Sequence, residues 1–172
     1  MDNTKHQLPA FTYGSIDGIV TTFAVVSASA GANLDTNIIL ILGIANILSD
    51  GFSMACSSYL SFKTVEDVQG RIFKYSPSEI AIITFISFVV LGIIPLIAFV
   101  IGHILKLPGK KMYPYSYFLT FLALFWVGYK KGVVLNHSPL YEGIQSLTIG
   151  GIASFISYIV GKILKGLNVP RI

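Results

Sequence analysis

The chain has 172 residues, of which 53% are hydrophobic and 12% are charged, and its mean hydropathy is +0.73. Soluble domains carry about 25% charged residues, so this composition excludes an ordinary water-soluble domain and favours a membrane protein. The formal net charge of +4 is small. We attribute it to basic side chains that anchor helices at lipid headgroups, and we expect no nucleic-acid partner.

Long apolar segments follow one another along most of the chain. A hydrocarbon core about 30 Å thick requires about 20 mostly apolar residues per helix. The segments that meet or approach this length are 11–32, 36–62, 79–105, 112–130 and 142–166. They predict an all-α integral membrane protein with five transmembrane helices in a single domain over residues 1–172. Lys and Arg divide equally between the two sides, so they do not orient the chain.

The first segment carries a carboxylate within the stretch "SIDGIVTTFAVVSASAGA" at residues 15–32. At about 100° per residue, one helical face holds Asp17, Thr21, Ala24, Ala28 and Gly31. An ionised carboxylate in a bilayer costs several kcal/mol unless it is paired, hydrated or coordinated, which makes Asp17 a candidate functional residue. The alternative is that Asp17 caps its helix at the headgroup level.

The second segment has a stronger polar face, on which Asn46, Asp50 and several serines lie together, with Met54 beside them. Oxygen donors next to a soft thioether suit a borderline divalent transition metal better than sodium or calcium. Alternatively, Asp50 forms a hydrogen bond to Ser or Asn of another helix, and Met54 fills the core. We interpret the small residues Ser27, Ala28 and Gly31, and Gly150, Ser154, Ser157 and Gly161 of the last segment, as close-packing surfaces.

Several prolines lie at or near the ends of the predicted segments. Pro77, Pro108 and Pro139 lie where helices are expected to start or stop, and Pro95 lies deep within the third segment, where it predicts a kink. The longest connection predicted between segments is 63–78. The histidines His6, His103 and His137 fall at segment ends or in connections, which indicates an interfacial position for each of them.

Three quoted stretches resemble the signature regions of the vacuolar iron transporter family: "DGIVTTFAVVSASAGA", "ILGIANILSDGFSMACSSYLS" and "GGIASFISYIVGKIL", with "LFWVGYKKG" before the last. The resemblance implies a five-helix homodimer with the ion path between the first helices of the two protomers. It implies export of ferrous iron or manganese from the cytosol, often in exchange for protons. It places the family's membrane aspartate at Asp17 and its methionine ligand at Met54. Asp50 and Asn46 lie within the matching second motif.

The chain departs from the better-known family members after the second segment, where they insert acidic cytosolic helices that collect metal. Only Glu66 and Asp67 are acidic in this connection, so we expect no metal buffering there. At the position of Asn46 some members have a carboxylate, which implies a weaker or less protonatable site here. The family orientation places the N-terminus in the cytosol, and the short chain suggests a prokaryotic plasma membrane, or a vacuolar membrane if the source is eukaryotic.

Two other functions remain open. A pair of intramembrane aspartates also describes an intramembrane aspartyl protease, in which one acts as acid and the other as base. Such enzymes have a Gly-x-Gly-Asp motif, whereas in "LSDGF" the glycine follows the aspartate. The second alternative is a transport-inactive scaffold with the same fold. We therefore expect no enzymatic activity and no cofactor; iron or manganese would be the transported substrate.

Overall fold

The computed structural model describes residues 3–69 and 75–167 of the chain, with side chains described for 7–68 and 75–167. The elements in chain order are α1 (Asn3–Ala32), α2 (Thr36–Gln69), α3 (Pro77–Gly92), α4 (Ile94–Ile104), the short 3-10 helix η1 (Gly109–Lys111), α5 (Tyr113–Leu135) and α6 (Pro139–Gly166). The described residues contain no strand. The prediction of an all-α protein is confirmed.

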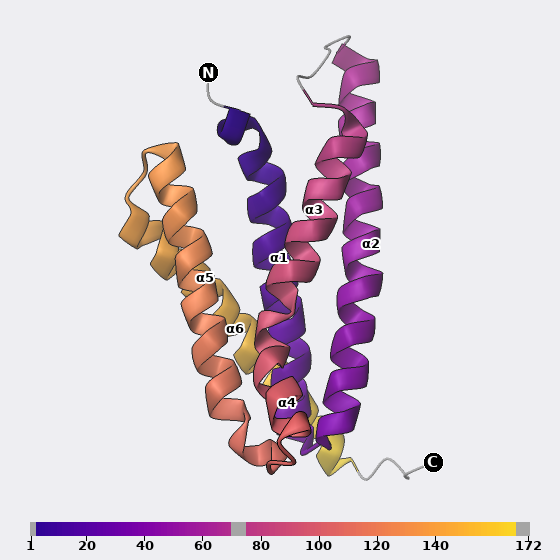
Figure 1. Cartoon of the computed structure of the whole chain (residues 1–172), viewed down its shortest axis with the longest axis vertical. Coiled ribbons are helices and arrows are strands. Elements are labelled where there is room, and N and C mark those ends of the chain that lie inside the picture. The colour runs from indigo at the N-terminus through magenta and orange to yellow at the C-terminus, as the bar shows by residue number, and fades with distance from the viewer. Residues whose placement is uncertain (1–2, 70–74, 168–172) are drawn as a thin grey trace.

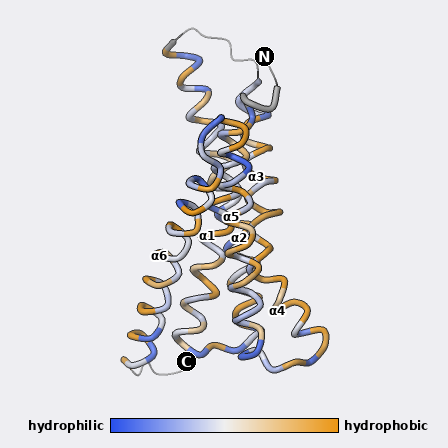
Figure 2. Tube along the Cα trace, turned by 90° about the vertical axis from the view of Figure 1, so that its left-hand side faces the viewer, coloured by the Kyte–Doolittle hydropathy of each residue, from blue (hydrophilic) through white to orange (hydrophobic). Residues whose placement is uncertain are grey.

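The helices form an elongated bundle, and the N-terminal and C-terminal ends lie at opposite ends of it (Figure 1). Four helices, α1, α2, α5 and α6, are individually long and apolar enough to cross a membrane, and the bent pair α3 and α4 can serve as a fifth span. The hydrophilic segments gather at the turns near the two ends of the bundle (Figure 2). This arrangement agrees with the predicted five spans.

The bend between α3 and α4 is 45° and lies just before Pro95. Proline has no backbone N–H and its ring collides with the carbonyl one turn earlier, so a continuous helix is interrupted there. The hydroxyl of Ser116 on α5 donates a hydrogen bond to the backbone carbonyl of Pro95. The predicted kink is therefore present, and a neighbouring helix stabilises it.

Several helix ends have the capping residues that the sequence provides. Pro77 and Pro139 occupy the first turns of α3 and α6, and Ser76 with Glu79 forms a reciprocal capping box. Helix α5 ends at Leu135, and its C-cap residue Asn136 adopts a left-handed conformation with φ 57°. Helix α2, by contrast, continues to Gln69, so the expected connection 63–78 is wrong for residues 63–69.

Helix α1 lies at the centre of the bundle, between α3 on one side and α6 on the other (Figure 1). Gly14 and Gly18 make the approach to α3 possible, because a Cβ atom at Gly18 would overlap the backbone of Phe88. On the other side, Ala28 packs against Gly161 and Gly31 packs against the backbone of Tyr158. Small residues on both sides thus let two helix backbones approach α1 closely.

The predicted packing role of these small residues is confirmed at several positions. The hydroxyls of Ser27 and Ser154 lie 2.7 Å apart and form a buried hydrogen bond between α1 and α6. Gly150 packs against Leu124 of α5. Close packing and hydrogen bonds between helices are the main sources of association in a bilayer, where no hydrophobic driving force brings helices together.

Candidate functional site

Asp17 lies in the interior of α1, because this helix begins at Asn3. The proposed role as a helix cap is therefore wrong. The side chain is half-buried, next to Gly18, which faces α3. Thr21 donates its hydroxyl to the backbone carbonyl of Asp17 at 2.8 Å, which leaves the carboxylate itself uninvolved. The close approach of α1 and α3 at Gly18 thus fixes the backbone from which Asp17 projects.

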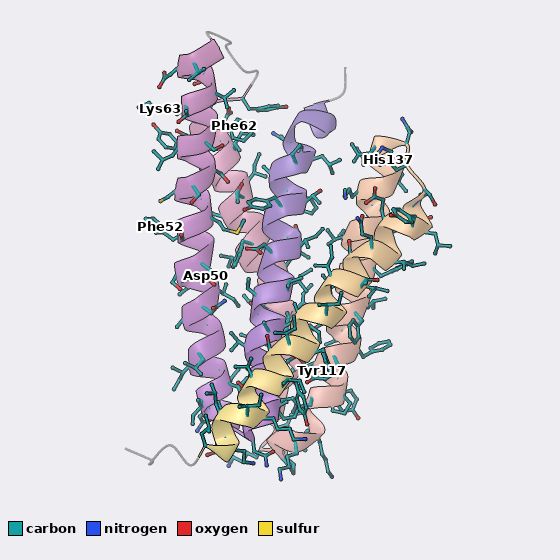
Figure 3. The ribbon with its side chains drawn as sticks, turned by 180° about the vertical axis from the view of Figure 1, so that it is seen from behind. Asp50, Phe52, Phe62, Lys63, Tyr117 and His137 are labelled. Carbon is teal, nitrogen blue, oxygen red and sulfur yellow. The ribbon has the colours of Figure 1, made fainter. Side chains whose placement is uncertain are left out.

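Asn46, Asp50 and Met54 follow one another at intervals of one helical turn along α2, and all three are half-buried. The neighbouring positions Gly43, Ile47 and Gly51 are buried, and Gly43 and Gly51 pack against Leu96 and Phe88. The three candidate ligands therefore lie beside the face of α2 that packs against the rest of the bundle. Phe52 points to the outer side of α2 (Figure 3).

The two aspartates lie on α1 and α2, which contact each other. Within the part of the chain whose side chains are described, neither carboxylate makes a hydrogen bond or an ion pair. The predicted alternative, a hydrogen bond from Asp50 to a Ser or Asn of another helix, is likewise not observed there. The amide nitrogen of Asn46 is also buried without a hydrogen-bond partner in this part of the chain.

Lys131, a basic residue near Asp17, already forms an ion pair with another carboxylate. Lys131 of α5 lines the same cavity as Asp17, but its Nζ lies 2.7 Å from Oε2 of Glu142. His137 approaches the other oxygen of Glu142 at 3.1 Å, at the turn between α5 and α6 (Figure 3). Glu142 therefore holds Lys131, and the carboxylate of Asp17 has no basic partner among the described side chains.

Two cavities flank the N-terminal half of α1. One, of about 450 Å³, lies between α1, α5 and α6; Asp17 and Lys131 are among its polar lining residues, and aliphatic side chains make up most of the rest. The other, of about 360 Å³, lies between α1, α2 and α3 and is lined by Ser57, Ser58 and Ser61 of α2. Tyr13 lines both cavities.

The predicted donor residues stand on two helices, α1 and α2, that contact each other. Asp17 on α1 and Asp50 on α2 provide carboxylate oxygens, Asn46 an amide oxygen and Met54 a thioether sulfur. Among the described residues no cluster of three or more His, Cys, Asp or Glu side chains is placed to hold a metal. The described residues of one chain therefore place these donor atoms on two helices without forming a multi-residue metal cluster by themselves.

Sequence reasoning missed the cluster formed by Lys131, His137 and Glu142. His137 was correctly expected at a helix end, but its acidic partner lies in the first turn of the following helix. The stretch "KKGVVLNHSPLYE" could have indicated this ion pair. It has a basic residue near the end of one helix and an acidic residue in the first turn of the next helix.

Comparison with known proteins gives matches over most of the chain. A model of the VIT family matches residues 8–72 and 69–162. The vacuolar iron transporter of Plasmodium falciparum (isolate 3D7) is 24% identical over 229 aligned residues, which cover 94% of this chain and 83% of the relative. Vacuolar iron transporter 1 of Arabidopsis thaliana is 23% identical over 209 residues, covering 88% and 84%. The resemblance seen in the sequence motifs is confirmed.

The alignments also indicate where this chain is shorter. The alignment with the Plasmodium falciparum protein spans 229 positions, more than the 172 residues of this chain, so that relative contains segments without a counterpart here. The family model matches in two parts that meet at residues 69–72, where α2 ends at Gln69. Both findings favour an insertion in relatives between the second and third spans.

Proposed function

The chain belongs to the VIT family, and on this premise we propose that it transports divalent transition-metal ions, ferrous iron or manganese, across a membrane. The observation that carries this proposal is the pair Asp17 and Asp50, two unpaired carboxylates on adjacent membrane-spanning helices. Uncompensated carboxylates are costly in hydrocarbon, and a divalent cation offsets both their repulsion and their desolvation.

In this proposal the ligands have distinct roles. Asp17 and Asp50 supply the negative charge, and Asn46 turns its amide oxygen toward the ion. Met54 contributes a soft sulfur donor that favours ferrous iron over magnesium or calcium. Because Asn46 is uncharged, the site binds the ion less tightly than a site with three carboxylates would. Weaker binding favours release of the transported ion.

The proposed direction of transport is out of the cytosol, from the side that holds the N-terminus. When no metal is bound, at least one of the two carboxylates holds a proton, and metal binding displaces it because coordination requires the deprotonated form. Acidity on the far side reprotonates the pair and expels the ion, which gives metal–proton exchange. The proposed location is a prokaryotic plasma membrane.

We further propose that the transporter is a homodimer, with the path between the α1 helices of two protomers. Ser49, Ser53 and Ser57 are exposed on the polar side of α2, next to the stripe that carries Asp50. Asp17 is likewise half-exposed on α1. Polar groups in a bilayer turn toward protein or water and not toward lipid. A second copy would cover this face, enclose a hydrated path and double the number of donors.

Metal binding to the purified protein tests the site itself. Mn²⁺ at about a hundred times its Kd should increase the free energy of unfolding by about 2.7 kcal/mol. Asp17→Asn and Asp50→Asn keep the side-chain shape and remove the charge, so each should abolish this stabilisation and reduce the protons released on metal addition. Thermal unfolding with and without Mn²⁺, together with titration in a weakly buffered solution, measures both effects.

Asp35→Asn is the matched control, because Asp35 lies in the short turn between α1 and α2, well over a helical turn from either site carboxylate along the chain. This variant should keep the full metal response. If the two site variants respond to Mn²⁺ as the unmodified protein does, the metal site is not where we place it.

A further inference from the structure

Glu142 is a buried charge that the proposed transport mechanism does not use. Among the described residues it is the only charged one that is buried, with 7% of its surface exposed. It lies in the first turn of α6, where it accepts a hydrogen bond from Nζ of Lys131 on α5 at 2.7 Å. Burial of a carboxylate costs free energy unless the group is paired. A charge kept at this cost invites a functional explanation.

The close packing of α5 and α6 does not depend on this ion pair. A Cβ atom at Gly128 would overlap the backbone carbonyl of Glu142, and one at Gly132 would come within 2.6 Å of Cα of Pro139. The side chain of Lys131 is 29% exposed, and ion pairs with access to solvent add only about 0–1 kcal/mol to stability. The glycine contacts therefore account for the approach of the two helices.

Lys131 lies near the level of Asp17 in the bundle. Val127, one turn before Lys131 on α5, belongs to a buried cluster with Ile19 of α1, and Ile16 packs against the same cluster. These two isoleucines flank Asp17 along α1, and α1 and α5 run in opposite directions (Figure 1). Lys131 is therefore about one helical turn, or about 5 Å along the axis, from the level of Asp17.

The two side chains also share one cavity. Asp17 and Lys131 both line the space of about 450 Å³ between α1, α5 and α6, and Asp17 is the only acidic residue among its described lining residues. A lysine ammonium is carried on a flexible four-carbon stem with three rotatable donors. If Glu142 did not hold this ammonium, Asp17 would be the carboxylate that it meets across the cavity. The resulting ion pair would neutralise Asp17 and weaken its attraction for a metal cation.

We propose that Glu142 is a positioning residue, whose carboxylate holds the ammonium of Lys131 away from Asp17 and so keeps Asp17 free to bind a cation. This inference deepens the proposed transport function and rests on it for the role of Asp17 as a metal ligand. The competition between Glu142 and Asp17 for Lys131 is a property of the chain itself and can be measured without metal.

Isothermal titration of the purified full chain with Mn²⁺ tests the effect on the metal. Glu142→Gln removes the charge that holds Lys131, so it should weaken Mn²⁺ binding about tenfold, which corresponds to about 1.4 kcal/mol. Lys131→Met, added to this variant, removes the competing ammonium and keeps a long, unbranched side chain. The affinity should then return to within about twofold of that of the unmodified protein.

Lys130→Met is the matched control, because Lys130 is the adjacent lysine of α5 and is exposed. In the Glu142→Gln chain it should not restore Mn²⁺ binding. Equal affinity in the Glu142→Gln and unmodified chains would overturn the proposal, and so would an equal rescue by Lys130→Met, which would point to net charge alone. Failure of the Glu142→Gln chain to fold would also overturn it, because Asp17 would then not have replaced Glu142 as the partner of Lys131.

Thermal unfolding without metal separates this proposal from the transport proposal. In the Glu142→Gln chain, Asp17→Asn should lower the unfolding midpoint by about 2–4 °C more than it does when Glu142 is present, because it then breaks an ion pair. Lys131→Met should remove this difference. No difference would contradict the proposal. If the difference is found but the unmodified protein binds no Mn²⁺, the role of Glu142 stands and the proposed cargo is wrong.

Discussion

Met54 distinguishes the candidate site from a purely oxygen-lined one. It is half-buried on α2, one turn beyond Asp50, and lies on the same edge of the helix. A thioether is a weak donor, and its main effect is on the choice between metals of different softness. The site therefore combines negative charge, which attracts any divalent ion, with one sulfur donor, which favours softer ions.

Met54→Leu tests this contribution. The substitution conserves volume and hydrophobicity, so it should cost less than about 1.5 kcal/mol of stability. We expect it to reduce Fe²⁺ transport more than Mn²⁺ transport, because manganese is the harder ion. Competition of the two ions in one flux assay measures the ratio. Met112→Leu, at a buried methionine packed against Gly102, is the control; an unchanged ratio in both variants would make Met54 core filler.

Single residues were informative in the sequence where their polarity differs from that of the residues around them. Asp17 and Asp50 stand out because a charge within an apolar helix has few explanations. Gly18 did not stand out, although the contact with Phe88 depends on it, because any glycine in a membrane helix fits its surroundings. Similarly, the ion pair of Lys131 with Glu142 depends on how α5 and α6 meet, which local patterns do not specify.

Among the helices, α1 combines two packing faces with one open face. Its contacts with α3 and α6 use Gly14, Gly18 and Gly31, and Tyr13, Asp17, Thr21 and Ala24 remain at least partly exposed. The sequence predicted one continuous face of small residues on α1, but in the structure this face has two parts with different surroundings. Its C-terminal part, at Ala28 and Gly31, packs on α6 of the same chain, and its N-terminal part remains available to a second copy.

Oxidative crosslinking tests whether a second copy covers this open face. In a Cys56→Ser background, Ala24→Cys should form a disulfide-linked dimer in the membrane, because the proposed interface brings the two α1 helices together. Leu122→Cys, at an exposed leucine of α5, should remain monomeric. Absence of a crosslink at both Thr21→Cys and Ala24→Cys would show that the α1 helices are not neighbours.

The helices themselves could be predicted well from hydropathy, since a span of fixed length is required by the bilayer. The ends were less predictable. Lys63, Glu66 and Asp67 are polar and so were assigned to a connection, but α2 continues through them to Gln69, because a helix remains favourable after it leaves the apolar region. Pro95, in contrast, predicted the bend between α3 and α4 through a steric effect that no packing removes.

On the scale of the whole molecule, the first and last helices end at opposite ends of an elongated bundle (Figure 1), and Asp17 and Asp50 lie within two of its candidate membrane spans. The connection from Gln69 to Pro77 is short, so in the proposed function the membrane helices select and move the ion. Chain order and composition could predict this layout. They could not predict that α1 would lie between α3 and α6, because that depends on how the helices pack.

Metal flux into proteoliposomes tests the central claim most directly. The unmodified protein should carry Fe²⁺, kept reduced, and Mn²⁺ across the membrane, faster when the opposite side is acidic. Asp17→Asn and Asp50→Asn should each reduce flux to the level of empty liposomes while the protein still folds and inserts, and Asp35→Asn should transport normally. Flux that persists in both site variants, or no flux of either ion with the unmodified protein, would contradict the account.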